Sequence, residues 1–131
     1  MKILADSDFL VALYKPDDSN HVKAKRIFKS IENDTTLFSL NLVFQESTTV
    51  ISKKMGMVHA KNFFELINHL VKSRIDLNQK LEQKAWQIFI KQTKKGTSFV
   101  DCANLAVLKE FELDKIASFD KAYPKNLLLN S

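Results

Sequence analysis

The chain contains few cysteines, glycines and prolines. Its one cysteine, Cys102, cannot close an internal disulfide, which excludes a disulfide-stabilised secreted scaffold and a cysteine-rich zinc module. Two glycines and two prolines in 131 residues leave no linker, no low-complexity tract and too few turns for a many-stranded sandwich. These absences exclude collagen-like, disordered and all-β proteins, and the single thiol favours a reducing compartment.

Long apolar runs are also missing. Asp6 and Asp8 interrupt the N-terminal stretch that a signal peptide would need, and no run approaches the ~20 apolar residues of a membrane span. We therefore expect a soluble, cytoplasmic protein without a membrane partner. A chain of 131 residues that is 45% hydrophobic is sufficient for about one domain with one core, so we expect a single domain over residues 1–131.

The charge is moderately basic, with 20 Lys and Arg against 15 Asp and Glu. If four of the acids gather in one cleft, 20 basic residues surround it with the other 11 acidic ones. A basic surface around an acidic cleft suits a polyanion whose phosphate must reach a bound cation. Lysine-rich helices that are merely solvated are the alternative, and charge alone favours that interpretation.

Hydrophobic patterning predicts strands that alternate with helices. Residues 2–5 form an apolar run typical of a strand buried on both faces of a parallel sheet. Further strands are expected at residues 35–39, 74–77, 115–119 and 127–129. Helices are expected at residues 9–14, 20–31, 41–54, 60–71, 81–95 and 98–113. This order predicts an α/β fold with a central, mostly parallel sheet flanked by helices.

Short polar residues and glycines mark several helix ends. Residues 17–19 are candidate N-caps for the second helix, and Asn41 and Ser98 are candidates for later ones. Gly56 and Gly96 follow expected helix C-termini, where glycine is favoured.

Three acids are expected at one end of the sheet. Asp6 and Asp120 follow predicted strands, and ligands of open parallel sheets bind beyond the carboxyl ends of strands. Asp101 lies in the first turn of the helix that follows Ser98, so it faces the same end. The alternative for Asp101 is a capping box with Ser98, which needs no function.

Glu46 shares a helical stripe with Val43, Ser47 and Val50. An ionised carboxylate on an inward stripe is costly unless a partner compensates its charge, so Glu46 indicates a bound cation. A position at the rim of the sheet is the alternative.

These acids predict a metal site made of oxygen ligands alone, which favours Mg²⁺ or Mn²⁺ over zinc. The histidines, His21, His59 and His69, have no metal-ligand spacing and are interpreted as surface or capping residues. Cys102 has no histidine nearby in the sequence, so we interpret it as a small buried residue.

Four stretches carry a resemblance to a known family. Residues 3–10, Glu46 within its helix, residues 99–103 and residues 117–121 resemble the four acidic motifs of PIN-domain ribonucleases, and among them the VapC-type toxins of toxin–antitoxin pairs. The resemblance spans nearly the whole chain and implies a PIN-like fold. It also implies a homodimer, an RNA substrate and a cognate antitoxin whose C-terminal segment blocks the cleft.

The resemblance assigns a role to seven residues. The catalytic, metal-binding quartet would be Asp6, Glu46, Asp101 and Asp120. Ser7 and Ser118 would be supporting hydroxyls, with Ser118 standing where threonine is frequent. Asp8 departs from the Asn, Ser or Thr common at its position, and it could add a ligand or hydrogen-bond the turn.

The mechanism expected from this site is hydrolysis of RNA by a metal-activated water, without a covalent intermediate. Lys15 and Lys121 are candidate contacts to the RNA backbone, with solvated charges as the alternative.

Two rival functions also fit parts of the sequence. An apolar strand followed by Asp6 and Asp8 also resembles haloacid-dehalogenase-like phosphatases, in which Asp6 would be the nucleophile and Asp8 a general acid. The chain lacks the pattern expected after Asp8 and has little room for that fold. The second rival is a catalytically silent module that binds RNA or protein, and the intact quartet argues against it.

Overall fold

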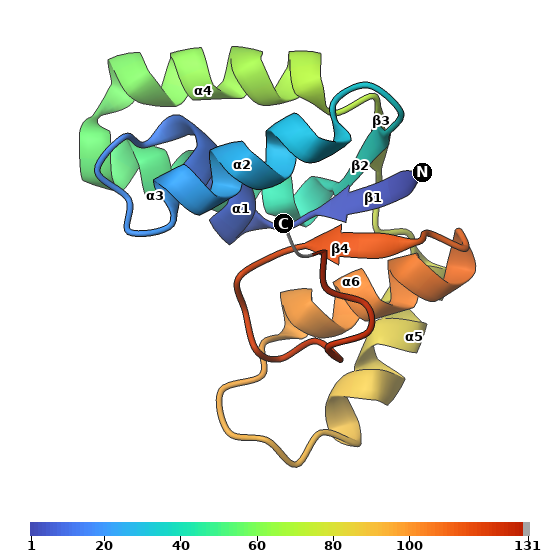
Figure 1. The fold of residues 1–131 in the computed structure, drawn as a ribbon. Coiled ribbons are helices and arrows are strands. Elements are labelled where there is room, and N and C mark those ends of the chain that lie inside the picture. The colour runs from blue at the N-terminus through green and yellow to red at the C-terminus, as the bar shows by residue number, and fades with distance from the viewer. Residues whose placement is uncertain (130–131) are drawn as a thin grey trace.

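Four parallel strands form the centre of the protein, whose computed structural model describes residues 1–129 (Figure 1). The strands are β1 (Lys2–Ala5), β2 (Thr36–Leu40), β3 (Ser73–Ile75) and β4 (Lys115–Ala117). Their order in the sheet is β3-β2-β1-β4, and every neighbouring pair is parallel. The predicted α/β fold with a parallel sheet is confirmed.

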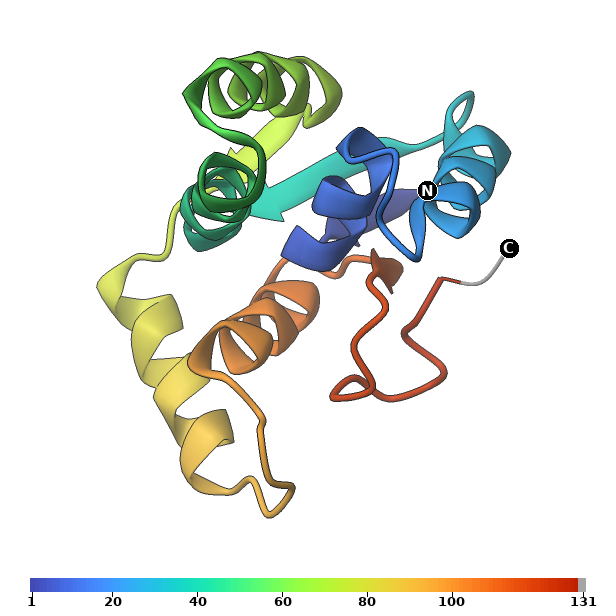
Figure 2. The same cartoon turned by 90° about the vertical axis from the view of Figure 1, so that its left-hand side faces the viewer.

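Six helices in the described part of the chain cover the sheet. They are α1 (Ser7–Tyr14), α2 (His21–Ile31), α3 (Asn41–Met55), α4 (Met57–Leu70), α5 (Gln79–Ile90) and α6 (Phe99–Glu110). In Figure 1, α4 lies at the top and α5 and α6 lie beneath β4; Figure 2 shows α1 and α2 across the sheet from α5 and α6. The chain thus moves outward from β1 through β2 to β3 and returns along the other side of the sheet to β4.

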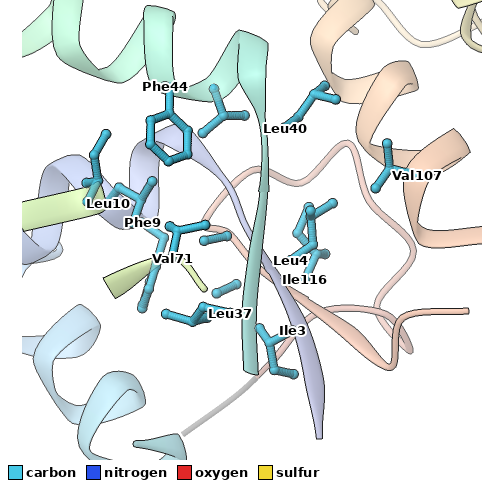
Figure 3. Packing of buried hydrophobic residues seen from close by; sticks show 14 of the residues in the cluster. Ile3, Leu4, Phe9, Leu10, Leu37, Leu40, Phe44, Val71, Val107 and Ile116 are labelled. Atoms are coloured by element: carbon cyan, nitrogen blue, oxygen red, sulfur yellow. The ribbon is translucent and has the colours of Figure 1, made fainter. Parts of the chain in front are cut away.

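Covering both faces explains why β1 is apolar without alternation. Ile3, Leu4 and Ala5 are fully buried, and so is Ile116 on the neighbouring strand β4. Figure 3 shows Ile3, Leu4 and Ile116 among residues of the flanking helices, such as Val107 of α6. Because a parallel strand between two helical layers has no face in water, the side chains on both of its faces must be apolar.

Helix α5 ends earlier than predicted. The expected end near Lys95 is wrong, because the helix ends at Ile90 with Lys91 as its C-cap. Residues 91–96 are all exposed, so they bring no apolar face to the core. Most helical stability in proteins comes from packing such a face, so the helix ends soon after its apolar stripe does. Helix α6 likewise ends at Glu110 rather than at residue 113.

The last predicted strand, residues 127–129, is wrong as well. Only Leu128 pairs with the sheet, through one isolated parallel bridge to Ile116. The backbone N–H groups of Leu127 and Leu128 instead donate to the carbonyls of Pro124 and Lys125, at 3.0 and 3.3 Å. A turn therefore uses the donors that a longer ladder would need. The expected domain over residues 1–131 extends two residues beyond the described part.

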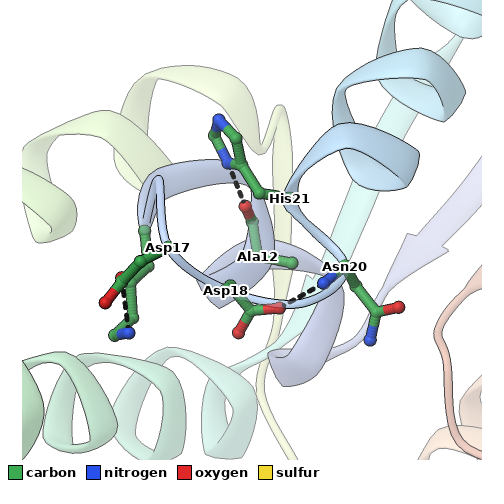
Figure 4. A network of polar contacts seen from close by, with 6 residues as sticks. Ala12, Asp17, Asp18, Asn20 and His21 are labelled. Atoms are coloured by element: carbon green, nitrogen blue, oxygen red, sulfur yellow. Dashed lines mark hydrogen bonds and ion pairs between the residues drawn. The ribbon is translucent and has the colours of Figure 1, made fainter.

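The predicted caps have mixed outcomes. Ser98 caps α6 as predicted, and Gly56, with φ of +92°, separates α3 from α4 in a conformation that favours glycine. Residues 17–19 do not cap α2, whose N-cap is Asn20; Asp18 Oδ1 accepts a hydrogen bond from the Asn20 backbone N–H at 2.9 Å (Figure 4). Asn41 does not cap α3 either, because its side chain accepts from the N–H of Leu77 at 3.0 Å.

Within residues 1–129, no helix is both long enough and apolar enough to span a membrane.

Candidate active site

A cleft of about 350 Å³ opens at the carboxyl end of the sheet. Asp6 follows β1 directly and Ser118 follows β4 directly, and these two strands are neighbours. The connections after β1 and before β4 run on opposite sides of the sheet (Figure 1). Such a switch point is where open α/β sheets bind ligands.

Acidic residues are the commonest kind in the lining of the cleft. Six carboxylates line it, those of Asp6, Asp8, Asp18, Glu46, Asp101 and Asp120. They come from distant stretches of the chain and include the whole predicted quartet. Among the lining residues the one basic side chain is that of Lys54, in the last turn of α3. The fold therefore brings together the four acids that the sequence suggested.

Asp6 is the most constrained of these carboxylates. It is only 5% exposed, and its Oδ1 accepts from the Ser7 backbone N–H at 2.8 Å and from Asn104 Nδ2 at 3.2 Å. Its Oδ2 lies 2.8 Å from the hydroxyl of Ser118 and 3.2 Å from that of Tyr123. Burial raises the pKa of Asp6 to about 6 although these hydrogen bonds counteract the shift.

Asp101 satisfies both interpretations made from the sequence. Its Oδ2 accepts from the Ser98 backbone N–H at 3.0 Å, and the Asp101 N–H donates to Ser98 Oγ at 3.1 Å, which completes the capping box. Its other oxygen, Oδ1, lies 3.2 Å from the Tyr123 hydroxyl. The cap therefore fixes the side chain and leaves one oxygen directed toward the Asp6 network.

Glu46 lies at the rim of the cleft, which corrects the expectation of an inward position. Val43 and Ser47 on the same helix are buried, but the Glu46 side chain is exposed. The inward stripe of α3 therefore runs beside Glu46 and does not include it, so no burial cost requires a cation there. The hydroxyl of Ser7 donates a hydrogen bond to Glu46 Oε1 and orients it toward the cleft.

Asp8 connects α1 to the segment after β4. Its carboxylate accepts from the backbone N–H of Phe119 at 3.1 Å and lies 3.3 Å from Ser118 Oγ. Burial, and then the charge of Asp6, raises the pKa of Asp8 to about 7. Of the two roles left open by the sequence, the hydrogen bond to the turn is observed. These bonds also explain why β4 ends at Ala117 instead of residue 119.

Asp120 is exposed and is held by its own turn. Its backbone N–H donates to Ser118 Oγ at 3.0 Å, and its Oδ1 accepts from the Ala122 N–H at 2.9 Å. The Ser118 hydroxyl thus accepts from the Asp120 N–H and lies within donating distance of Asp6.

Sequence reasoning missed two buried polar residues of this site. Asn104 and Tyr123 are 0% and 3% exposed, and both bind Asp6. One signal was present: Asn104 is a polar residue in the otherwise apolar stretch after Asp101, one helical turn further along the same helix. Nothing in the sequence around Tyr123 distinguished its hydroxyl from an ordinary surface group.

The two lysines suggested as RNA contacts lie outside the cleft lining. Lys15 Nζ pairs with Asp17 at 2.6 Å. Lys121 is exposed, and its carbonyl oxygen accepts from Lys94 Nζ at 3.0 Å. Their roles stay predictions, whereas Lys54, in the last turn of α3, lines the cleft.

The cleft has the donor chemistry of a hard-cation site. Across residues 1–129, no three His, Cys, Asp or Glu side chains are arranged to hold a metal ion as they stand. The oxygens of Asp6 and Asp101 are instead hydrogen-bonded to protein donors. Mg²⁺ binds through one or two carboxylates and keeps several waters, so the carboxylate oxygens that line this cleft suit it.

Comparison with known proteins identifies the family. A PIN domain family model matches residues 3–126. The 23S rRNA-specific endonuclease VapC20 of Mycobacterium tuberculosis is 25% identical over 118 residues, which cover 90% of this chain and 88% of that protein.

Two solved structures share the fold. The crystal structure of M. tuberculosis VapC20, a Sarcin-Ricin loop cleaving toxin, has a TM-score of 0.82 and 24% identity, covering 92% of this chain and 91% of that one. VapBC2 from Rickettsia felis, bound to a DNA fragment from its promoter, has a TM-score of 0.74 and 12% identity, covering 98% and 97%. With the family model matching nearly the whole chain, and with four acids in one cleft, this protein belongs to the PIN domain family.

Proposed function

We propose that this PIN domain is a metal-dependent endoribonuclease and the toxin of a VapBC-type toxin–antitoxin pair. The observation that carries the proposal is the convergence of Asp6, Glu46, Asp101 and Asp120 from four distant stretches on one cleft. The similarity to an endonuclease named VapC20 over 90% of the chain supports both the chemistry and the toxin role.

The quartet is the binding site for Mg²⁺ or Mn²⁺ in this proposal. When bound, the ion supplies Lewis-acid stabilisation of the scissile phosphate and lowers the pKa of a water. The residues around it hold the carboxylates in place: Ser7 orients Glu46, and Ser118 fixes Asp6. Asp8 anchors the turn that carries Asp120 through the N–H of Phe119.

The substrate is held by the basic surface around the acids. Lys54 lines the cleft and is exposed, so its ammonium can bind a phosphate next to the scissile one. Single-stranded or looped RNA fits best, because a flexible backbone can enter a cleft that a duplex cannot. The antitoxin and a second copy of this chain are the protein partners proposed.

The rival phosphatase has no support in the family comparison. The PIN domain match over residues 3–126 assigns the chain to another family. The silent binding module remains as one outcome of the experiment below.

The test is cleavage of single-stranded RNA by the purified protein with Mg²⁺ or Mn²⁺. We expect EDTA to abolish cleavage. We expect Asp101→Asn to lower the rate by about 100-fold or more, because a metal ion contributes several kcal/mol of transition-state stabilisation. Asp34→Asn, at an exposed site between α2 and β2, is the matched control and should cleave normally. Equal cleavage by Asp101→Asn and wild type would remove the proposed site, and no cleavage by wild type would favour the binding module.

Expression in cells tests the toxin role separately. We expect growth arrest that is relieved by Asp6→Asn or by a small protein encoded next to this chain. Arrest that persists with Asp6→Asn would contradict the link between the cleft and toxicity.

A further inference from the structure

The hydroxyl of Tyr123 lies between two of the buried carboxylates. Its oxygen is 3.2 Å from Asp6 Oδ2 and 3.2 Å from Asp101 Oδ1, and the Tyr123 side chain is only 3% exposed. Asp6 lies at the carboxyl end of β1, just before α1, and Asp101 lies in α6. One phenolic group from a third segment therefore joins them.

Asn104 determines which way the Tyr123 proton points. Asn104 Nδ2 donates to the Tyr123 oxygen at 3.0 Å and to Asp6 Oδ1 at 3.2 Å. Because the phenolic oxygen accepts from Asn104, its own proton is left to donate to Asp6 or Asp101. A tyrosine hydroxyl keeps its proton at neutral pH, since its ordinary pKa is about 10.

The side-chain orientation of Asn104 is energetically costly, because it leaves a buried polar atom without a hydrogen bond to the described part of the chain. Its Oδ1 is buried and has no hydrogen-bond partner within the described residues. A flipped amide would direct that oxygen at the Asp6 carboxylate, where two acceptors would face each other. A fully buried amide with one orphaned oxygen is a feature that a purely structural core does not need, and it points to a role in holding the carboxylates.

We propose that Tyr123, fixed by Asn104, is a positioning residue that sets the spacing of Asp6 and Asp101 for divalent-metal binding. Two buried carboxylates repel each other, and a hydroxyl that can donate to either one offsets this repulsion while no ion is bound. Tyr123 acts through the two carboxylates and does not itself contact substrate. The inference rests on the proposed function, because it takes both acids as metal ligands.

Replacing Tyr123 with phenylalanine removes the hydroxyl and keeps the ring. Tyr14→Phe is the matched control, since Tyr14 is the other tyrosine of the chain and its hydroxyl bonds His59 at 2.8 Å, away from the cleft lining. The measurement is Mn²⁺ binding to the purified protein by calorimetry, with circular dichroism to verify the fold. We expect Tyr123→Phe to weaken binding by about 10-fold, the low end for groups that orient metal ligands, and Tyr14→Phe to leave it unchanged.

A kinetic measurement separates positioning from general damage. In the RNA cleavage assay, Tyr123→Phe should need about 10-fold more Mn²⁺ for half-maximal rate and should recover most of the rate at saturating Mn²⁺. A structural defect alone would lower the rate at every Mn²⁺ concentration.

A second variant tests the inference without changing residue 123. Asn104→Leu has a similar shape, removes the orphaned oxygen and frees the Tyr123 hydroxyl to turn. We expect it to fold and to bind Mn²⁺ several-fold more weakly. Wild-type affinity in both Tyr123→Phe and Asn104→Leu would overturn the inference and leave the proposed function intact. Failure of the wild type to bind Mn²⁺ at all would overturn both.

Discussion

The interior of the sheet and the cleft at its carboxyl end differ sharply although they are adjacent in sequence. Ala5 is the last residue of β1, is fully buried and lies in an apolar environment, whereas Asp6 is buried in contact with four hydrogen-bond donors and near a second acid. Burial stabilises the fold at the first position and raises the pKa of the carboxyl at the second. The cleft thus departs from the rules that govern the core, as functional sites commonly do.

The largest effect should come from the core. Leu4→Ala removes a fully buried side chain of β1 and should lower the free energy of unfolding by about 2–5 kcal/mol, because the strand is closed in on both faces and cannot collapse around the cavity. Urea unfolding measures the change. A loss of less than 1 kcal/mol would mean that β1 is not the centre of the core.

Burial of the cleft carboxyl groups, unlike burial of the core side chains, should reduce the stability of the protein as the pH rises. The pKa of Asp6 is raised from 3.8 to about 6 and that of Asp8 to about 7, so the folded state holds these protons more tightly than the unfolded state. In EDTA, stability from these groups is therefore present below pH 4 and is lost as the pH rises to about 6 or 7. For Asp6 the loss is on the order of 3 kcal/mol. Thermal melting of Asp6→Asn between pH 4 and pH 7 should be flatter than that of wild type, and equal slopes would contradict the assignment.

Binding of a divalent metal ion should restore part of the stability that the buried carboxylates remove at neutral pH. At pH 7 a saturating divalent ion should raise the free energy of unfolding by about 2.7 kcal/mol at 100 times its dissociation constant, because it binds only the folded cleft. Thermal melting with and without Mn²⁺ measures this increase, and Asp101→Asn should reduce it. An equal increase in wild type and Asp101→Asn would place the ion elsewhere.

The smallest effect should come from the rim. Lys54→Gln should raise the KM for RNA a few-fold and reduce the slope of log affinity against log salt by about 0.7, the value for one phosphate contact on a single strand. Lys53→Gln removes the same charge from the neighbouring exposed residue, which is not among the cleft-lining residues, and should change both quantities less. Identical salt slopes in the two variants would show that Lys54 acts only through the overall field.

Local patterns predicted most of the fold. The apolar run of β1, the stripes of α2 and α4 and the cap at Ser98 are properties of short segments, and the structure has each of them. The errors fall where a segment depends on distant partners. Residues 127–129 looked like a strand, but the N–H groups of Leu127 and Leu128 bond within their own turn, and only the N–H of Leu129 donates to the sheet, at Ile116.

The sequence by itself determined which acids lie at the carboxyl end of the sheet. Residue type and order along the chain were sufficient to place Asp6, Asp101 and Asp120 there. Only the tertiary structure decided that Glu46 lies at the rim and that the Tyr123 hydroxyl joins Asp6 to Asp101. The physical reason is the distance along the chain over which each effect acts. Periodicity and capping act over a few residues, whereas the neighbours of a side chain in the cleft are chosen by packing between segments about a hundred positions apart, such as Asp6 and Tyr123.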